Sequence, residues 1–196
     1  MKIVLASSSK YRIQQLNDFG LDFLAVRPLF DEEKLKNKGL KPKKLCARLA
    51  YEKAASLTLQ HADDVIIGAD QLVSFRNEIL GKPGTKKNAV KMLKKMQGKS
   101  HLLVTSVCML YKNKKATRTV VANIKMRKLS NKEISQYVSL DNPIDCAGSY
   151  KLEKAGLSLV ESLRVSDPSS LTGLPLIALR DLFLELGVKP QFLKKL

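Results

Sequence analysis

The feature that most constrains the fold is a short apolar run that ends in a carboxylate. Residues 65–69 read Val-Ile-Ile-Gly-Ala and are followed directly by Asp70. An uncharged run of this length, rich in β-branched residues, predicts a buried strand. A carboxylate at the end of such a strand must be paired, hydrogen-bonded or bound to a cation. Because open α/β sheets bind ligands at the carboxyl ends of their strands, the run predicts both a core strand and a site at Asp70.

Strand and helix patterns alternate along the rest of the chain. We expect a further strand over 72–75 with a hairpin turn at Arg76-Asn77, and a capping box at Ser130 and Glu133 predicts the start of a helix. The other expected strands are 2–6, 21–26, 102–111, 117–127 and 157–163, and further expected helices are 42–60, 86–96 and 176–186. Since no repeat or clear linker interrupts them, residues 1–196 are expected to form a single α/β domain with a mixed sheet.

The strong positive charge raises the question of nucleic-acid binding. The chain carries 35 Lys and Arg against 18 Asp and Glu, a net charge of +17. The lysines are spread over several segments, and aromatic residues, which single-strand binders place among basic ones, make up only 6%. We therefore expect no specific nucleic-acid partner, and interpret the excess as a solvated surface that attracts anionic ligands.

Composition also bears on the compartment. The sequence has no run of about 18 apolar residues, so no membrane partner is expected, and the apolar stretch at residues 1–6 is too short for the core of a signal peptide. The three cysteines, Cys46, Cys108 and Cys146, lack metal-like spacing and favour free thiols in a reducing compartment. Together these features predict a cytoplasmic protein.

Two lysines stand out as partners for Asp70. Lys53 falls on the apolar stripe of the helix expected over 42–60, where a lysine either extends its ammonium to solvent or meets an anion. Lys82, just before Pro83 in the loop after residues 72–75, would place a fixed positive charge beside the carboxylate. A carboxylate and lysines at the end of a strand suggest phosphate and metal chemistry, although Asp70 in a structural salt bridge or a helix cap is the alternative.

A serine-rich segment precedes the first expected helix. Ser7-Ser8-Ser9 links a strand to that helix, and hydroxyls together with helix N-terminal amides suit a phosphate. Arg12, in the first helical turn, would add a bidentate contact. The alternative is an ordinary serine cap followed by a surface arginine.

Other candidate groups are weaker. Glu32, in the acidic loop 31–33, would supply a second ligand to a magnesium ion, unless the loop is simply solvated. His61 and His101 have no serine or cysteine partner motif nearby, and neither a P-loop nor a G-x-G-x-x-G pattern is present. A serine- or cysteine-dependent hydrolase is therefore not favoured.

Six segments taken together resemble the Maf family of nucleoside triphosphate pyrophosphatases. They are 5–12 (LASSSKYR), 52–54 (EKA), 67–71 (IGADQ), 80–83 (LGKP), 146–150 (CAGSY) and 173–176 (GLPL). The resemblance implies a mixed twisted sheet flanked by helices, with two lobes around a deep cleft. It also implies a divalent metal, Mg or Mn, cleavage of a nucleotide to its monophosphate and pyrophosphate, and a possible homodimer.

Within that family the chain is similar to the YceF type, which acts on 7-methyl-GTP. The positions that distinguish this type from the dTTP and UTP type fall on Tyr11, Gln71 and Glu153. A positively charged 7-methylguanine ring would gain a cation–π contribution of ~0.5–2 kcal/mol on Tyr11. Glu153 would accept hydrogen bonds from the N1 and N2 donors of the base. A thymine or uracil would leave that acceptor poorly paired, at a cost of ~1–3 kcal/mol.

These observations predict a pyrophosphatase that hydrolyses 7-methyl-GTP by metal-assisted attack of water at the α-phosphorus. Asp70 is the expected catalytic residue, with Asp70 and Glu32 as metal ligands. Ser9, Arg12, Lys53 and Lys82 are expected to bind the triphosphate. The alternatives are a dTTP or UTP pyrophosphatase of the same family, and a non-catalytic module that binds nucleic acid or a cell-division partner.

Overall fold

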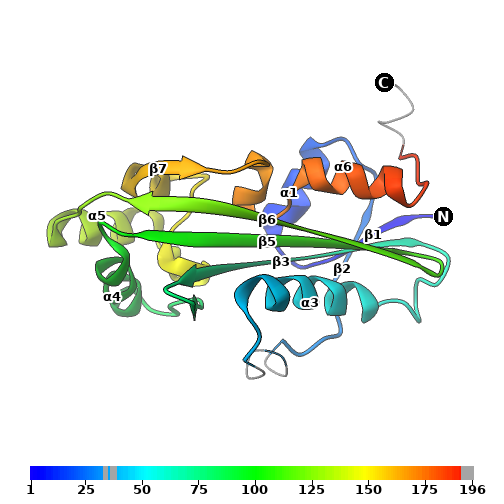
Figure 1. Cartoon of the computed structure of the whole chain (residues 1–196), viewed down its shortest axis with the longest axis horizontal. Helices are drawn as coiled ribbons and strands as arrows, with labels where there is room; N and C mark the ends of the chain where they lie inside the picture. The colour runs from blue at the N-terminus through cyan, green and yellow to red at the C-terminus, as the bar shows by residue number, and fades with distance from the viewer. Residues whose placement is uncertain (33–34, 36–38, 191–196) are drawn as a thin grey trace. The chain divides into compact units, whose positions relative to one another are not determined.

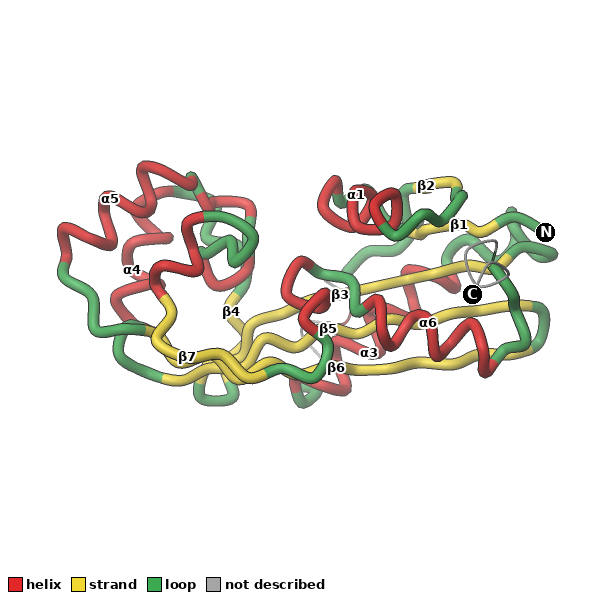
Figure 2. The backbone as a smooth tube through the Cα atoms, turned by 90° about the horizontal axis from the view of Figure 1, so that it is seen from above, coloured by secondary structure: helices red, strands yellow, loops and turns green. Residues whose placement is uncertain are grey.

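The computed structural model describes residues 1–32, 35 and 39–190 of the 196-residue chain (Figures 1 and 2). The chain divides into two compact units, which we call the first and the second unit. The first comprises Met1–Asp70, Thr105–Val120 and Asp167–Leu196, and the second comprises Gln71–Val104 and Val121–Ser166. Glu33, from the acidic loop, lies outside the described residues. Within the described part of the chain, no helix has both the length and the apolar character needed to cross a membrane.

Seven strands of the described chain form one mixed sheet, in the order β2-β1-β3-β5-β6-β7 with β4 beside β3. Strand β1 pairs in parallel with β2 and β3, whereas β4 pairs antiparallel with β3, and β7 with β6. The strands are β1 (Ile3–Ala6), β2 (Leu24–Val26), β3 (Val65–Phe75), β4 (Glu78–Leu80), β5 (Ser100–Tyr111), β6 (Lys114–Met126) and β7 (Val160–Arg164). The mixed α/β fold predicted from the sequence is therefore confirmed.

In the first unit, helices cover both faces of the strands. Figure 1 shows α1 (Lys10–Asp18) and α6 (Leu176–Glu185) on one side and α3 (Pro42–Ala55) on the other. The chain leaves β1 through α1 to reach β2, then returns through α3 to β3 on the opposite side of β1. Such a switch in direction is where open α/β sheets form a ligand-binding crevice. The topology therefore points to the carboxyl end of β1 and the adjacent part of β3.

A glycine allows α3 to approach β3 very closely. A Cβ atom at Gly68 would lie 2.1 Å from the carbonyl oxygen of Ala50 and 2.7 Å from the amide nitrogen of Ala54. Both contacts are with helix backbone, so no side-chain movement would relieve them. Because residues two apart on a strand share a face, Asp70 faces the same helix as Gly68. This contact brings the side chains of α3 within reach of Asp70.

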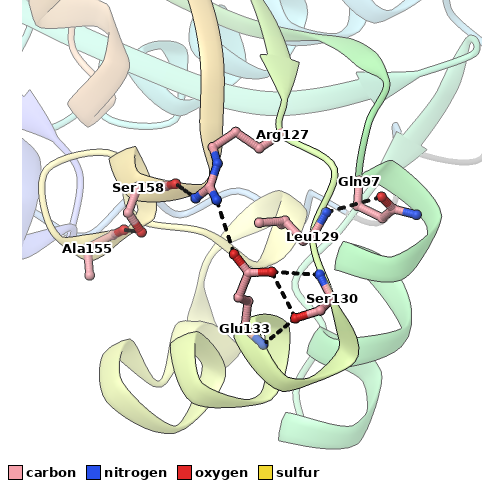
Figure 3. Close-up of polar contacts among 7 residues, drawn as sticks. All are labelled: Gln97, Arg127, Leu129, Ser130, Glu133, Ala155 and Ser158. Atoms are coloured by element: carbon pink, nitrogen blue, oxygen red, sulfur yellow. Dashed lines mark hydrogen bonds and ion pairs between the residues drawn. The ribbon is translucent and has the colours of Figure 1, made fainter.

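The second unit packs two helices and several short 3₁₀ turns. The helices are α4 (Lys86–Met96) and α5 (Asn131–Asp141), and the turns are η1 (Pro143–Asp145), η2 (Ala147–Ser149) and η3 (Ala155–Leu159). Helix α4 buries Ala89, Leu93 and Met96 and exposes its lysines, as its periodicity predicts. The capping box at the start of α5 is also confirmed, because Ser130 and Glu133 exchange hydrogen bonds (Figure 3).

Strand boundaries differ from the sequence prediction by one to three residues in β1, β5 and β6, and by more in three further places. Strand β3 continues without a break through Asp70 to Phe75, so the prediction that the strand ends at Asp70 is wrong. Antiparallel pairing with β4 runs from Val73 to Phe75 in this extension, while the parallel partner β1 ends opposite Gly68. Strand β2 is shorter than expected because the end of α1 turns through Gly20, with φ of 73°, and bonds the Leu21 amide. Part of the expected strand 157–163 is 3₁₀ helix η3.

The hairpin after β3 follows the prediction. Arg76 and Asn77 adopt φ values of 52° and 65°, and Phe75 pairs with Glu78 across the turn. Two consecutive residues with positive φ are typical of the tight turns that match the twist of a hairpin.

Candidate active site

A buried cluster of charged side chains lies where β3 meets α3 in the first unit. The Nζ atom of Lys53 is 2.6 Å from Oδ1 of Asp70 and 2.9 Å from Oε1 of Glu32. Lys53 and Asp70 are only 7% and 6% exposed, while Glu32 is more open to solvent. The lysine on the apolar stripe thus meets anions rather than solvent, and three predicted site residues are brought together.

The backbone carbonyl of Asp70 is bound by Cys46, which lies on α3 as Lys53 does. The Sγ–H group of Cys46 donates to the Asp70 carbonyl oxygen at 3.3 Å. Burial and the neighbouring Asp70 carboxylate raise the pKa of the Cys46 thiol to about 12, although the Arg12 charge partly opposes this shift. The thiol therefore stays protonated at neutral pH and keeps its hydrogen bond. All three cysteines of the chain are free, as predicted.

The serine segment after β1 leads directly into the N-terminus of α1. Ser7 is buried, and its Oγ atom accepts a hydrogen bond from the Ser9 amide at 3.1 Å. Ser9 occupies the N-cap position, but its side chain makes no capping hydrogen bond. The first intrahelical hydrogen bond runs from the Ile13 amide to the Ser9 carbonyl. The backbone amides before Ile13 therefore lie outside the intrahelical hydrogen-bond series, as at any helix N-terminus. The arrangement is not an ordinary serine cap and suits an oxyanion.

Arg12 is not a free surface arginine. Its Nε atom donates to the carbonyl oxygen of Gly173 at 2.8 Å, and its side chain is half-buried. Gly173 has a φ of 110°, and a Cβ atom there would lie 3.4 Å from Nε of Arg12. This contact fixes the guanidinium through one nitrogen. Because Arg12 and Asp70 both act on the Cys46 thiol, the two charges belong to the same region of the first unit.

Tyr11 lies beside Arg12 on α1 and is half-buried. The ammonium of its neighbour Lys10 is 5.4 Å from the centroid of the Tyr11 ring. The ring therefore already accepts one cation over its face, which is the chemistry expected of a residue that stacks on a positively charged base.

Three predicted site residues belong to the second unit. Gln71 follows Asp70 on β3, but successive strand side chains point to opposite faces, so it shares its face with Val73 rather than with Asp70. Lys82 is exposed in a loop that is anchored by the Gly84 amide on the Ile144 carbonyl at 3.0 Å. Glu153 is exposed on a tight turn between η2 and η3.

Neither histidine forms a nucleophile–base pair. His61 bonds Asp64 at 3.1 Å in the first unit, and His101 is buried against Tyr150 in the second at 2.9 Å. Burial lowers the pKa of His101 to about 4. The sequence-based exclusion of a histidine-dependent nucleophile agrees with these contacts.

Sequence reasoning missed residues of both units whose contacts hold predicted site residues or their neighbouring segments in place. The roles of Cys46 and of the Gly173 carbonyl depend on contacts across 24 and 161 residues, which no local pattern signals. Gln15 on α1 also binds the Ser169 and Leu174 carbonyls, and so holds the same segment as Arg12. Lys151 is a buried lysine outside any helix or strand and gave no periodic signal.

The acidic residues of the first unit fit a divalent cation. Asp70 and Glu32 reach the same ammonium, so their carboxylates converge on one point. No cluster of three or more His, Cys, Asp or Glu side chains suited to a metal occurs among the described residues. Magnesium commonly binds one or two carboxylates and completes its shell with water and substrate phosphates. Asp70 and Glu32 supply the number of carboxylates that this pattern requires.

The sequence is similar to known proteins over nearly its whole length. The sequence model of the family described as "Maf-like protein" matches residues 2–186. The 7-methyl-GTP pyrophosphatase of Bdellovibrio bacteriovorus is 46% identical over 178 residues, covering 91% of this chain and 93% of the relative. That of Aromatoleum aromaticum is 42% identical over 180 residues, covering 91% and 92%.

Among solved structures, the Staphylococcus aureus Ham1 protein aligns with a TM-score of 0.47 at 14% identity, covering 94% of this chain and 98% of that one. The assignment to a family rests on the sequence matches instead. They extend over nearly the whole chain and preserve its length, and on that ground this chain belongs to the Maf family.

Proposed function

We propose that this protein is a nucleotide pyrophosphatase that hydrolyses 7-methyl-GTP to 7-methyl-GMP and pyrophosphate. The observation that carries the proposal is the buried Asp70 carboxylate, held by Lys53 at the switch point of the sheet. The relatives at 46% and 42% identity, whose names specify this activity, support the choice of reaction and substrate.

In the proposed reaction, water attacks the α-phosphorus of the nucleotide. The new bond joins the water oxygen to that phosphorus, and the bond from the α-phosphorus to the bridging oxygen breaks, so pyrophosphate leaves. Asp70 orients the water and accepts its proton. The Cys46 hydrogen bond to the Asp70 backbone and the Lys53 ion pair hold the carboxylate in place for this role.

The triphosphate would be bound by positively charged side chains and by polar groups at the start of α1. Ser9 and the first amides of α1 suit one phosphate, and Arg12 is fixed beside them through its Nε atom. Lys53 and Lys82 would offset the charge that builds up on the leaving pyrophosphate. Lys53 would then exchange a carboxylate partner for a phosphate oxygen.

Asp70 and Glu32 would hold the divalent metal, Mg or Mn. When bound, such an ion polarises phosphoryl oxygens and neutralises part of the phosphate charge. The role of Glu32 is consistent with its partial exposure, because a side chain at the rim of the cluster can change partners.

Base selection is assigned to Tyr11, Gln71 and Glu153. The positive 7-methylguanine ring would stack on Tyr11, with a cation–π contribution of ~0.5–2 kcal/mol. Glu153 would accept hydrogen bonds from N1 and N2 of that base, and a thymine or uracil would leave this acceptor poorly paired at a cost of ~1–3 kcal/mol. These contributions correspond to a preference of about tenfold or more.

A product assay tests the proposal. Purified protein with magnesium or manganese is offered 7-methyl-GTP, GTP, dTTP, UTP and CTP, and pyrophosphate and orthophosphate are measured separately. The Asp70→Asn variant should retain the fold but lose turnover, while Asp63→Asn, an exposed aspartate on the same unit, should match the wild type. Near-normal turnover of Asp70→Asn would remove Asp70 from the mechanism. Release of pyrophosphate mainly from dTTP or UTP would overturn the base assignment.

A further inference from the structure

We propose that Lys151 is a positioning residue that fixes the turn carrying Glu153, and that it thereby sets nucleotide selectivity. The inference rests on the proposed function, because it assigns Lys151 a role through a residue proposed to read the base. Every contact in the argument lies within the second unit.

The turn that carries Glu153 closes on the backbone of Lys151. The Lys151 carbonyl oxygen accepts hydrogen bonds from the amides of Lys154 at 3.1 Å and Gly156 at 3.0 Å. A Cβ atom at Gly156 would lie 2.4 Å from that oxygen and 2.7 Å from the Lys151 amide nitrogen. The turn is therefore wound tightly around Lys151, and Glu153 is exposed within it.

The backbone of Lys151 is in turn bound to α5. Its amide donates to the phenolic oxygen of Tyr137 at 2.9 Å, and Tyr137 is a buried residue of that helix. A buried phenol in a packed helix has little freedom to move. One end of the turn is thus attached to the body of the second unit.

The ammonium of Lys151 makes a second attachment to the same helix. Its Nζ atom lies 3.2 Å from each of three acceptors: the carbonyl oxygens of Asp141 and Asn142 and the Oδ1 atom of Asp145. An ammonium has three N–H donors, so these acceptors match its capacity. The first two acceptors lie at the carboxyl end of α5, where the helix dipole favours a positive charge. Lys151 is 7% exposed, so this ammonium is fixed rather than presented to a ligand.

The segment after the turn is attached to the other end of α5. Arg127 donates to the Ser158 carbonyl at 2.7 Å and to Glu133 at 3.1 Å, and Glu133 caps the helix (Figure 3). The backbone amide of Arg127 also donates to the Leu159 carbonyl at 2.9 Å. One flank of the turn is therefore bound to α5 directly and the other through Arg127, while Glu153 and Lys154 remain exposed. The backbone position from which Glu153 extends is thus fixed, and a fixed support is what recognition of base donors requires.

A double-mutant cycle tests whether Lys151 acts through Glu153. The variants are Lys151→Met, Glu153→Gln and the pair, and the readout is the ratio of kcat/KM for 7-methyl-GTP to that for dTTP. Lys151→Met should lower the ratio by about tenfold, with little change in kcat/KM for dTTP. The reason is that one hydrogen-bonding group, the Glu153 carboxylate, would no longer be well placed for the base. The pair should match Glu153→Gln alone, because residues that act through one another are not additive.

Two controls separate positioning from a general structural role. Lys151→Arg should partly restore the ratio, and Lys154→Met, which removes a neighbouring exposed charge, should leave it unchanged. Tyr137→Phe removes only the hydroxyl that accepts from Lys151, and should lower the ratio in the same direction without loss of folding. If Lys151→Met fails to fold, the ratio measured for Tyr137→Phe tests the positioning role in its place.

Hydrogen exchange of the Lys154 and Gly156 amides gives a readout that does not need turnover. Exchange at both amides should become faster in Lys151→Met and Tyr137→Phe. An unchanged ratio, additive effects in the pair, or unchanged exchange in folded variants would each overturn the role of Lys151. By contrast, failure of Glu153→Gln to alter the ratio, or absence of pyrophosphate release by the wild type, would overturn the proposed function, and exchange would still decide whether Lys151 fixes the turn.

Discussion

Two buried lysines, one in each unit, have the same exposure but different partners. Lys53 and Lys151 are each 7% exposed. Lys53 lies on α3 of the first unit and contacts the carboxylates of Asp70 at 2.6 Å and Glu32 at 2.9 Å. Lys151 lies in a loop of the second unit and contacts two backbone carbonyls at the end of α5 and one carboxylate.

The kind of partner indicates what each lysine can do. Side-chain carboxylates and substrate phosphates are alternative anions, so a lysine among carboxylates can change partners when a nucleotide binds. Helix carbonyls are fixed by the backbone and have no other strong donor at a helix end. Burial alone therefore does not distinguish a lysine that takes part in chemistry from one that maintains the shape of a loop. The acceptors distinguish them.

Substitution of the two lysines should separate these roles most strongly. Lys53→Met should lower pyrophosphate release from every nucleotide by about 10²-fold or more, because a charge that stabilises the transition state is lost. Lys151→Met should instead change the ratio between nucleotides. Steady-state kinetics on the nucleotide panel measures both, with Lys44→Met, an exposed lysine of α3, as the control. Loss of activity on all nucleotides in Lys151→Met, without loss of folding, would break the comparison.

Substitution of the closely packed glycines Gly68 and Gly156 should also separate the role of the first unit in turnover from that of the second unit in selectivity. Gly68→Ala would place a Cβ atom 2.1 Å from the Ala50 carbonyl, and Gly156→Ala one 2.4 Å from the Lys151 carbonyl. Each should lower the free energy of unfolding by about 3 kcal/mol or more, because backbone opposes both. Urea denaturation measures this effect. Gly81→Ala, which would meet no atom within 4 Å, should leave stability unchanged. Per folded molecule, Gly68→Ala should lose turnover, and Gly156→Ala should lose selectivity.

Acid should weaken the second unit through His101. Burial lowers the pKa of His101 from 6.5 to about 4, so the unfolded chain binds this proton more readily between those pH values. Stability is therefore expected to fall as pH decreases from 6.5 to 4, by about 3 kcal/mol from this residue. The slope of unfolding free energy against pH measures it. His101→Phe should have a correspondingly shallower slope, and equal slopes would contradict the assignment.

The smallest expected effect concerns the opposite end of α5 from Lys151. Ser130→Ala removes the N-cap hydrogen bonds shown in Figure 3 and should cost about 1 kcal/mol of unfolding free energy. The nucleotide ratio should stay at the wild-type value, because Lys151 binds the other end of the helix. Thermal unfolding and the ratio assay together test this pair of expectations. A change in the ratio equal to that of Lys151→Met would mean that helix stability, not the position of the turn, controls selectivity.

Much of the fold could be predicted from the sequence because it depends on local patterns. The amphipathic period of α4 and the capping box of α5 involve residues within a few positions of each other. The same applies to the placement of Lys53 on a buried stripe, which required only the period of a helix. The apolar run before Asp70 identified a core strand, although it did not reveal that the strand continues without a break to Phe75, where it pairs with β4.

By itself the sequence determined which residues are buried on each element and that a carboxylate and a lysine would need partners. Only the tertiary structure decided which partners they have. The contact between Gly68 and α3 brings Lys53 to Asp70, and the end of α5 receives Lys151, a residue that no periodic pattern marked. The physical reason is that local periodicity fixes the direction of a side chain on its element, whereas its acceptors come from packing between segments far apart in the chain.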